Sequence, residues 1–299
     1  MGVALPLLFV FLWSTGYVTA TLVAPYSEPL SILTLRFSGA AVVLLLFGLI
    51  ARGPWPSAQR TLTIIASGVL IHGLYLSCVF WGVKNGMPAG ISALLIGLQP
   101  LLTAVLASPL LGEKVFLRHW IGLVIGLFGC TLVVLPRLTF DGIGITPQTL
   151  TAHAIGVTAI VLGSIFQKRF VGTMDFRTEP GLQLLGGVLV ALPIALMTES
   201  FAFTPSPQLF AGYAWMTLIL SCISFPLYMY LLQLGEASKV AGLFYLVPAS
   251  SAIQGYLLFN ETLTPIQFIG MAIATAAVAL ASDMLFKPKP QMQDDTGSP

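Results

Sequence analysis

The feature that most constrains this sequence is a repeat at a spacing of 148 residues. The segment from Gln99 to Glu113 is matched by the segment from Val247 to Glu261. From position 89 to position 125, 11 of the 37 residues are identical to the residue 148 positions later, without a gap. Leucine and alanine are so common here that some identities arise by chance, so the shared proline, glycine and glutamate carry most weight. The sequence therefore predicts two copies of one structural unit.

The unit is too apolar for a water-soluble protein. Hydrophobic residues make up 57% of the chain and charged residues 8%, whereas about a quarter of a typical soluble domain is charged. A helix needs about 20 apolar residues to cross a bilayer, and charged residues, prolines and glycines divide the chain into ten such runs. We therefore predict an all-α polytopic membrane protein with ten transmembrane helices, near 2–22, 29–51, 60–82, 88–111, 117–136, 149–169, 179–199, 209–232, 238–259 and 264–286.

The positive charges predict how these helices are oriented. If the N-terminus is cytoplasmic, ten Lys and Arg residues fall in cytoplasmic segments and only Lys84 and Arg137 fall outside, as the positive-inside rule requires. Both termini then face the cytoplasm of a bacterial inner membrane. Because five helices are an odd number, the second repeat starts on the opposite side, and the repeats are inverted as in many secondary transporters. The predicted units are a first repeat over 1–136, a periplasmic linker over 137–148, a second repeat over 149–286 and a disordered cytoplasmic tail over 287–299.

Several other protein classes lack support in the sequence. The three cysteines lie in three different apolar runs without metal-ligand spacing, so no metal site is predicted. A Walker A motif, an HExxH zinc pair and a GxSxG elbow are missing, so neither a cofactor nor an enzymatic activity is predicted. The net charge of +2 gives no reason to expect a nucleic-acid partner.

The partners expected are a small-molecule substrate and membrane lipid. The fifth and tenth helices are expected at the periphery, where the spacing of Gly122 and Gly126 offers a homodimer contact as an open alternative. A non-transporting scaffold is a further alternative.

The block from Pro100 to Glu113 and its second copy, together with Arg36-Phe37, resemble the drug/metabolite transporter superfamily. The resemblance extends over residues 2–286 and is closest to the ten-span branch of bacterial metabolite exporters. Within that branch, the chain is most similar to the aromatic amino acid and methyl viologen exporters. The resemblance implies a secondary transporter that exports amino acids or other metabolites.

Polar and aromatic side chains line up on faces of the predicted helices. Trp13 and Tyr17 are four residues apart, and His72 lies near the middle of its helix with Tyr75 three residues later. In an inverted-repeat transporter, the substrate lies near the membrane midplane where the repeats meet. The substrate-binding residues predicted on this basis are Trp13, Tyr17, His72, Tyr75, Gln99, Ser224, Tyr228, Tyr245 and Ser251.

The repeated prolines Pro100 and Pro248 predict a hinge in each of two gates, because proline can kink a helix. The prediction is therefore alternating access around a central cavity, for aromatic or similarly apolar amino acids and metabolites. An exporter of drugs or quaternary cations, which cation–π contacts would hold, is the main alternative. The middle of every predicted helix lacks a carboxylate, which disfavours cation exchange.

Three charged residues have structural interpretations. Arg36 lies inside the second helix and is expected to snorkel or to pair with Glu28. Glu113 and Glu261 are each expected to cap the helix that follows them, because a carboxylate stabilises the positive end of a helix.

Overall fold

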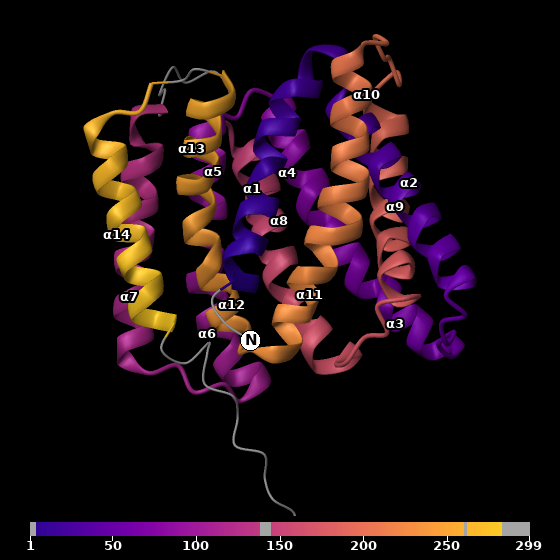
Figure 1. Cartoon of the computed structure of the whole chain (residues 1–299), viewed down its shortest axis with the longest axis horizontal. Coiled ribbons are helices and arrows are strands. Elements are labelled where there is room, and N and C mark those ends of the chain that lie inside the picture. The colour runs from indigo at the N-terminus through magenta and orange to yellow at the C-terminus, as the bar shows by residue number, and fades with distance from the viewer. Residues whose placement is uncertain (1–3, 138–144, 260–261, 283–299) are drawn as a thin grey trace, which may run out of the picture.

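The computed structural model describes residues 4–137, 145–259 and 262–282, which form a bundle of helices (Figure 1). An isolated bridge between Ser27 and Phe203 is the extent of β structure in these residues. The first half contains α1 (Ala4–Val23), η1 (Ala24–Tyr26), α2 (Pro29–Ile50), α3 (Ala58–Gly68), η2 (Val69–Leu74), α4 (Tyr75–Lys84), α5 (Ala89–Ile96), α6 (Gln99–Leu111), α7 (Leu117–Val134) and η3 (Leu135–Arg137). The second half contains α8 (Pro147–Phe166), η4 (Gln167–Val171), α9 (Glu179–Thr198), α10 (Pro207–Ala214), η5 (Trp215–Ser224), α11 (Phe225–Leu234), α12 (Ala237–Gly242), η6 (Leu243–Leu246), α13 (Val247–Phe259) and α14 (Pro265–Ser282).

Within the described residues, nine helical segments of 18 to 28 residues are long and apolar enough to cross a membrane. A further apolar segment, Pro265–Ala279, is shorter. These findings confirm an all-helical polytopic membrane protein, while the count of ten spans stays a prediction. Most of the predicted linker and the whole predicted tail lie outside the described residues.

Local sequence signals set where helices begin and end. Ser57, Thr146 and Ser206 each precede a helix, and the side chain of each accepts a hydrogen bond from a backbone N–H three residues later. Pro207 follows Ser206 in the first turn of α10, where the missing N–H of proline breaks no helical hydrogen bond. Gly112 ends α6 with a φ of 70°, a left-handed conformation that favours glycine.

Helices from the two halves of the chain pack against each other throughout the bundle. α7 and α14 form the most extensive pair and lie together at one edge of the molecule (Figure 1). α2 also packs against α9, α4 against α8, and α1 against α13. The backbones of α7 and α14 approach so closely that a Cβ built on Gly129 would lie 2.6 Å from the nitrogen of Ala274.

The glycine spacing on α7 serves packing inside the chain. A Cβ built on Gly126 would lie 2.5 Å from the ring of Tyr245, so this side chain of the same chain covers the glycine. Gly122 is buried as well. The alternative use of this spacing as a homodimer contact stays a prediction, although Tyr245 already covers Gly126.

Two membrane-spanning segments are interrupted at equivalent positions of the two halves. α5 ends before α6 begins, and the 3-10 helix η6 joins α12 to α13. The bounds of α6, 99–111, and of α13, 247–259, differ by 148 at both ends. Pro100 and Pro248 lie in the first turns of α6 and α13, where proline is tolerated. Each proline thus begins the second part of a broken helix and does not kink a continuous one; its role as a hinge stays a prediction.

The third and eighth membrane-spanning segments, Ala58–Lys84 and Pro207–Leu234, contain π-helical turns, η2 and η5 respectively. Adding 148 to the bounds of η2 gives 217–222, which lies inside η5. π-helical turns within longer helices occur frequently at functional sites. η2 carries His72, and η5 carries Ser221 and Ser224.

Candidate functional site

Four aromatic side chains form a cluster where α1, α11 and η6 meet. Phe9 and Trp13 come from α1, Tyr228 comes from α11, and Phe244 comes from η6. All six pairs of rings have centroids 5.3 to 5.6 Å apart, the separation at which aromatic pairs attract. The hydroxyl of Tyr228 shares a 2.8 Å hydrogen bond with Ser164 of α8, which fixes the ring. We call Phe9, Trp13, Tyr228 and Phe244 the aromatic cluster.

The stripe of α1 that carries the cluster becomes more exposed along the helix. Phe9 is 0% exposed, Trp13 is half-buried, and Tyr17, one turn further, is 44% exposed. Thr21 continues the stripe and is also exposed. The stripe is therefore buried at Phe9 and exposed beyond Trp13, toward the end of the bundle opposite to that at which α1 begins. We call the end at which α1 begins the N-terminal end.

His72 lies beside this cluster on the third segment. The His72 ring is 4.0 Å from the ring of Phe225 and 5.4 Å from the ring of Phe37. Phe225 belongs to the same buried apolar group as Phe9 and Tyr228. Tyr75, three residues after His72, is buried in a separate apolar group with Val79 and Ile160.

Several predicted binding residues hold buried polar atoms that lack a hydrogen-bond partner among the described residues. These atoms are Nε2 of His72, both amide atoms of Gln99, Oγ of Ser224 and the hydroxyl oxygen of Tyr245. Leaving such a group unpaired inside a protein costs about 1–3 kcal/mol, so nearly all buried polar groups bind protein or water. Ser224 shares one helical face with Tyr228, four residues later. The unpaired atoms of His72 and Ser224 therefore lie on the segments that carry Phe225, Tyr228 or His72 itself, whereas those of Gln99 lie on α6.

Two predicted binding residues lie in other surroundings. The Tyr245 ring packs between α6 and α7, in an apolar group with Ala104 and Cys130. Ser251 donates a 3.3 Å hydrogen bond to the carbonyl of Ser14, and this bond joins α13 to α1. The structure does not bring these two side chains into the aromatic cluster. Their predicted contact with substrate has no support from this geometry.

Sequence reasoning missed Phe9 and Phe244, and it misplaced the partner of Arg36. Phe9 precedes Trp13 by four residues, so extending the stripe on α1 by one turn would have found it. Arg36 does not pair with Glu28; its Nε donates a 2.8 Å hydrogen bond to Oγ of Ser221 in η5. The reason is that the Glu28 carboxylate accepts hydrogen bonds from the backbone N–H groups of Ser200 and Ala202.

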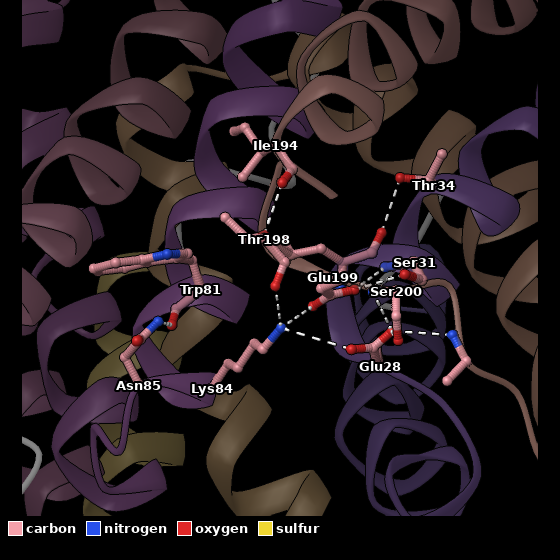
Figure 2. A network of polar contacts seen from close by, with 12 residues as sticks. Glu28, Ser31, Thr34, Trp81, Lys84, Asn85, Ile194, Thr198, Glu199 and Ser200 are labelled. Atoms are coloured by element: carbon pink, nitrogen blue, oxygen red, sulfur yellow. Dashed lines mark hydrogen bonds and ion pairs between the residues drawn. The ribbon is translucent and has the colours of Figure 1, made fainter. Parts of the chain in front are cut away.

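A network of carboxylates joins helix ends at the end of the bundle opposite to the N-terminal end (Figure 2). Glu28 accepts hydrogen bonds from the backbone N–H groups of Ser200 and Ala202 at 2.9 and 3.0 Å. These bonds, that of Ala202 foremost, hold the pKa of Glu28 below its usual range. Glu199 is fully buried, lies 3.1 Å from Nζ of Lys84, and accepts hydrogen bonds from the first turn of α2. The network thus joins the ends of α2, α4 and α9.

A second carboxylate closes the N-terminal end. Glu113 accepts hydrogen bonds from the backbone N–H groups of Ala237 and Ser238 at 2.7 and 3.2 Å, and its Oε1 lies 3.0 Å from Nζ of Lys168. Burial opposes ionisation of this carboxyl group, yet Lys168 and the Ala237 N–H outweigh it and lower its pKa. The expectation that Glu113 caps the helix after it is therefore wrong: it caps α12, in the other half of the chain. Glu261 lies outside the described residues.

Among the described residues, no group of three or more His, Cys, Asp or Glu side chains is placed to hold a metal ion. What the bundle does hold at its centre is a set of aromatic rings, unpaired polar atoms and one arginine. A polytopic helical bundle with polar groups inside is the architecture of membrane transporters.

Comparison with known proteins agrees with that class. Residues 1–135 and 149–283 match the EamA-like transporter family, and the chain belongs to this family of the drug/metabolite transporter superfamily. The protein PecM of Dickeya dadantii is 25% identical, over 95% of this chain and 94% of its own length. A probable amino-acid metabolite efflux pump of Escherichia coli is 25% identical, over 90% of each chain. A solved crystal structure shares the fold with a TM-score of 0.77 and 20% sequence identity, covering 93% of this chain and 96% of that chain.

Proposed function

We propose that this transporter exports aromatic or similarly apolar amino acids and metabolites across the bacterial inner membrane, by alternating access and without ATP. The observation that carries the proposal is the aromatic cluster beside the unpaired polar atoms of His72 and Ser224. An apolar ring would pack on the cluster, and the polar atoms would orient the rest of the solute. The E. coli relative described as an amino-acid metabolite efflux pump supports the same substrate class.

The proposal includes ten membrane spans arranged as two inverted repeats. The matching bounds of α6 and α13 support it, as do those of α7 (117–134) and α14 (265–282), which again differ by 148. The helix contacts are also consistent with a two-fold relation. η2 packs on α8 as η5 packs on α1, and each of these contacts becomes the other when the halves are exchanged.

We assign the N-terminal end to the cytoplasm, together with the C-terminus, because most Lys and Arg residues lie there. In this orientation, the exposure gradient from Phe9 to Tyr17 corresponds to a conformation open toward the periplasm. Alternating access would close that side and open the cytoplasmic side. The broken helices at Pro100 and Pro248 supply equivalent hinges for the two movements. Self-association would use the exposed apolar faces of α7 and α14.

Export of quaternary cations fits the site less well. A cation is most simply held by a carboxylate, and the described carboxylates lie at the two ends of the bundle. The charge inside the bundle is instead positive, on Arg36. A carrier for neutral or zwitterionic solutes is the better match.

The test is transport by the purified protein in liposomes. Labelled phenylalanine, tyrosine or tryptophan should move down its gradient faster than through empty liposomes of the same lipid. A flux equal to that of empty liposomes for all three would overturn the proposal. A pH gradient across the same liposomes would show whether protons drive the movement.

A further inference from the structure

Arg36 is a half-buried cation without a carboxylate partner among the described residues. It is the eighth residue of α2, about 10 Å along the helix from its first residue at 1.5 Å per residue. Nε donates to Oγ of Ser221 at 2.8 Å, and the Ser221 hydroxyl donates to the carbonyl of Met216 at 3.1 Å. The guanidinium is thus oriented by a neutral hydroxyl group.

The acidic side chains of the described residues are all committed to other cations. Each of the six lies within 4.0 Å of a lysine or of an arginine other than Arg36. These six residues are Glu28, Glu113, Asp175, Glu179, Glu199 and Glu236. The charge of Arg36 is therefore not neutralised from within the described part of the chain.

An arginine whose charge is not neutralised inside a membrane-spanning bundle is energetically unfavourable, so a function is expected for it. A charged residue inside a membrane costs several kcal/mol and, as a rule, faces a polar cavity or binds a partner. Both Nη atoms of Arg36 lack a hydrogen bond to the described residues, while the side chain is half-buried. These two groups form the planar fork with which arginine binds a carboxylate through two parallel hydrogen bonds.

The position of this fork relative to the aromatic cluster follows from η5 and α11. Ser221, which orients Arg36, shares one face of the eighth segment with Ser224 and with Tyr228 of the cluster. The guanidinium therefore lies about two helical turns from the cluster, on the open side of it. His72, whose Nε2 has no hydrogen-bond partner among the described residues, contacts the cluster through Phe225.

We propose that Arg36 binds the carboxylate of the transported solute, while the aromatic cluster holds its apolar group. The substrates are then carboxylates with an apolar side group, such as amino acids and arylalkanoic acids, and amines without a carboxylate are excluded. This inference rests on the proposed transport function, and it adds a recognition rule that transport by itself does not require.

The first experiment uses the unaltered protein and needs no mutation. Phenylalanine, 3-phenylpropionate, phenylalaninamide and 2-phenylethylamine are titrated against the purified protein in detergent, and thermal stabilisation is measured. The two carboxylates should stabilise the protein at concentrations about tenfold or more below those at which the amide or the amine does. Equal stabilisation by all four, or stabilisation by the amine and amide only, would overturn the inference.

The second experiment uses Arg36→Gln and Arg36→Lys in liposomes, with Arg118→Gln as the matched control. Arg118 is exposed at the start of α7, far from the cluster. The half-saturation concentration for phenylalanine should rise about tenfold or more in Arg36→Gln, less in Arg36→Lys, and stay unchanged in the control. Unchanged saturation in both Arg36 variants would overturn the inference. Failure of the unaltered protein to transport any aromatic amino acid would instead overturn the proposed function. The binding titration would still test whether the site prefers ligands with a carboxylate.

Discussion

Oε1 of Glu113 lies 3.0 Å from Nζ of Lys168, and the same carboxylate accepts the N–H of the first residue of α12. Lys168 also donates to the carbonyl of Gly235, in the turn between α11 and α12. This ion pair and its hydrogen bonds thus join the loop after α6 to η4 and to the start of α12. These are the contacts that must separate if the N-terminal end of the bundle opens.

The lowered pKa of Glu113 predicts a stability that depends on pH. A carboxyl group whose pKa is lower in the folded state stabilises that state above its ordinary pKa, about 4.5, and loses this contribution as the pH falls through the lowered value. Thermal unfolding of the unaltered protein should therefore occur at lower temperature as the pH drops below about 4.5. Part of this pH dependence should vanish in Glu113→Gln.

The control for this prediction is Arg118→Gln. Arg118 is exposed at the start of α7 and makes no ion pair with the described residues, so its loss should alter stability little. An identical pH profile for Glu113→Gln and the unaltered protein would contradict the role given to Glu113.

The buried carboxylate of Glu199, at the end opposite to the N-terminal end, leads to a prediction about stability alone. Glu199 caps α2 through the N–H groups of Leu30 and Ser31 and pairs with Lys84 (Figure 2). Glu199→Gln should lower the free energy of unfolding by about 2 kcal/mol, because the cap weakens and Lys84 loses its closest carboxylate. Glu28→Gln should cost less, because its side chain is 27% exposed. Chemical denaturation in detergent measures both, and a larger loss for Glu28→Gln would contradict the ranking.

The limits of sequence reasoning are visible in two neighbouring residues. Patterns of spacing indicated the apolar helices, their repeat at 148 residues, and the stripe that contains Trp13. They did not separate Phe244 from Tyr245, because both lie in η6, where three residues make a turn and neighbours point about 120° apart. Only the packing of helices distant in sequence shows that Phe244 faces Trp13 and that Tyr245 faces Gly126.

The ionic contacts were beyond sequence reasoning for a similar reason. Glu113 and Ala237 are 124 residues apart, and Arg36 and Ser221 are 185 residues apart. Local rules for capping assign a carboxylate to the nearest helix start, and they cannot report that a helix of the other half begins closer in space. The family and the class of fold were therefore predictable, while the partners of the charged side chains were not.

The different surroundings of Trp13 and Tyr245 predict opposite effects on transport. Trp13→Ala removes three ring contacts of the aromatic cluster and should reduce phenylalanine flux about tenfold or more. Tyr245→Phe should change flux by less than about twofold, because its hydroxyl lacks a hydrogen bond in the described residues and the ring stays packed. Flux is measured in liposomes and normalised to inserted protein. A large loss in Tyr245→Phe with none in Trp13→Ala would move the binding site to the α6–α7 side.

The proposed orientation predicts which loops reagents can reach in intact cells. Asn85, after α4, and Gln59, at the start of α3, are both exposed and lie at opposite ends of the third segment. With Cys78, Cys130 and Cys222 replaced by alanine, Asn85→Cys should react with a membrane-impermeant maleimide in intact cells. Gln59→Cys should react only after the membrane is permeabilised, because the N-terminal end is assigned to the cytoplasm by its lysines and arginines. Labelling of Gln59→Cys but not of Asn85→Cys in intact cells would reverse the orientation, and the open side of the aromatic cluster would then face the cytoplasm.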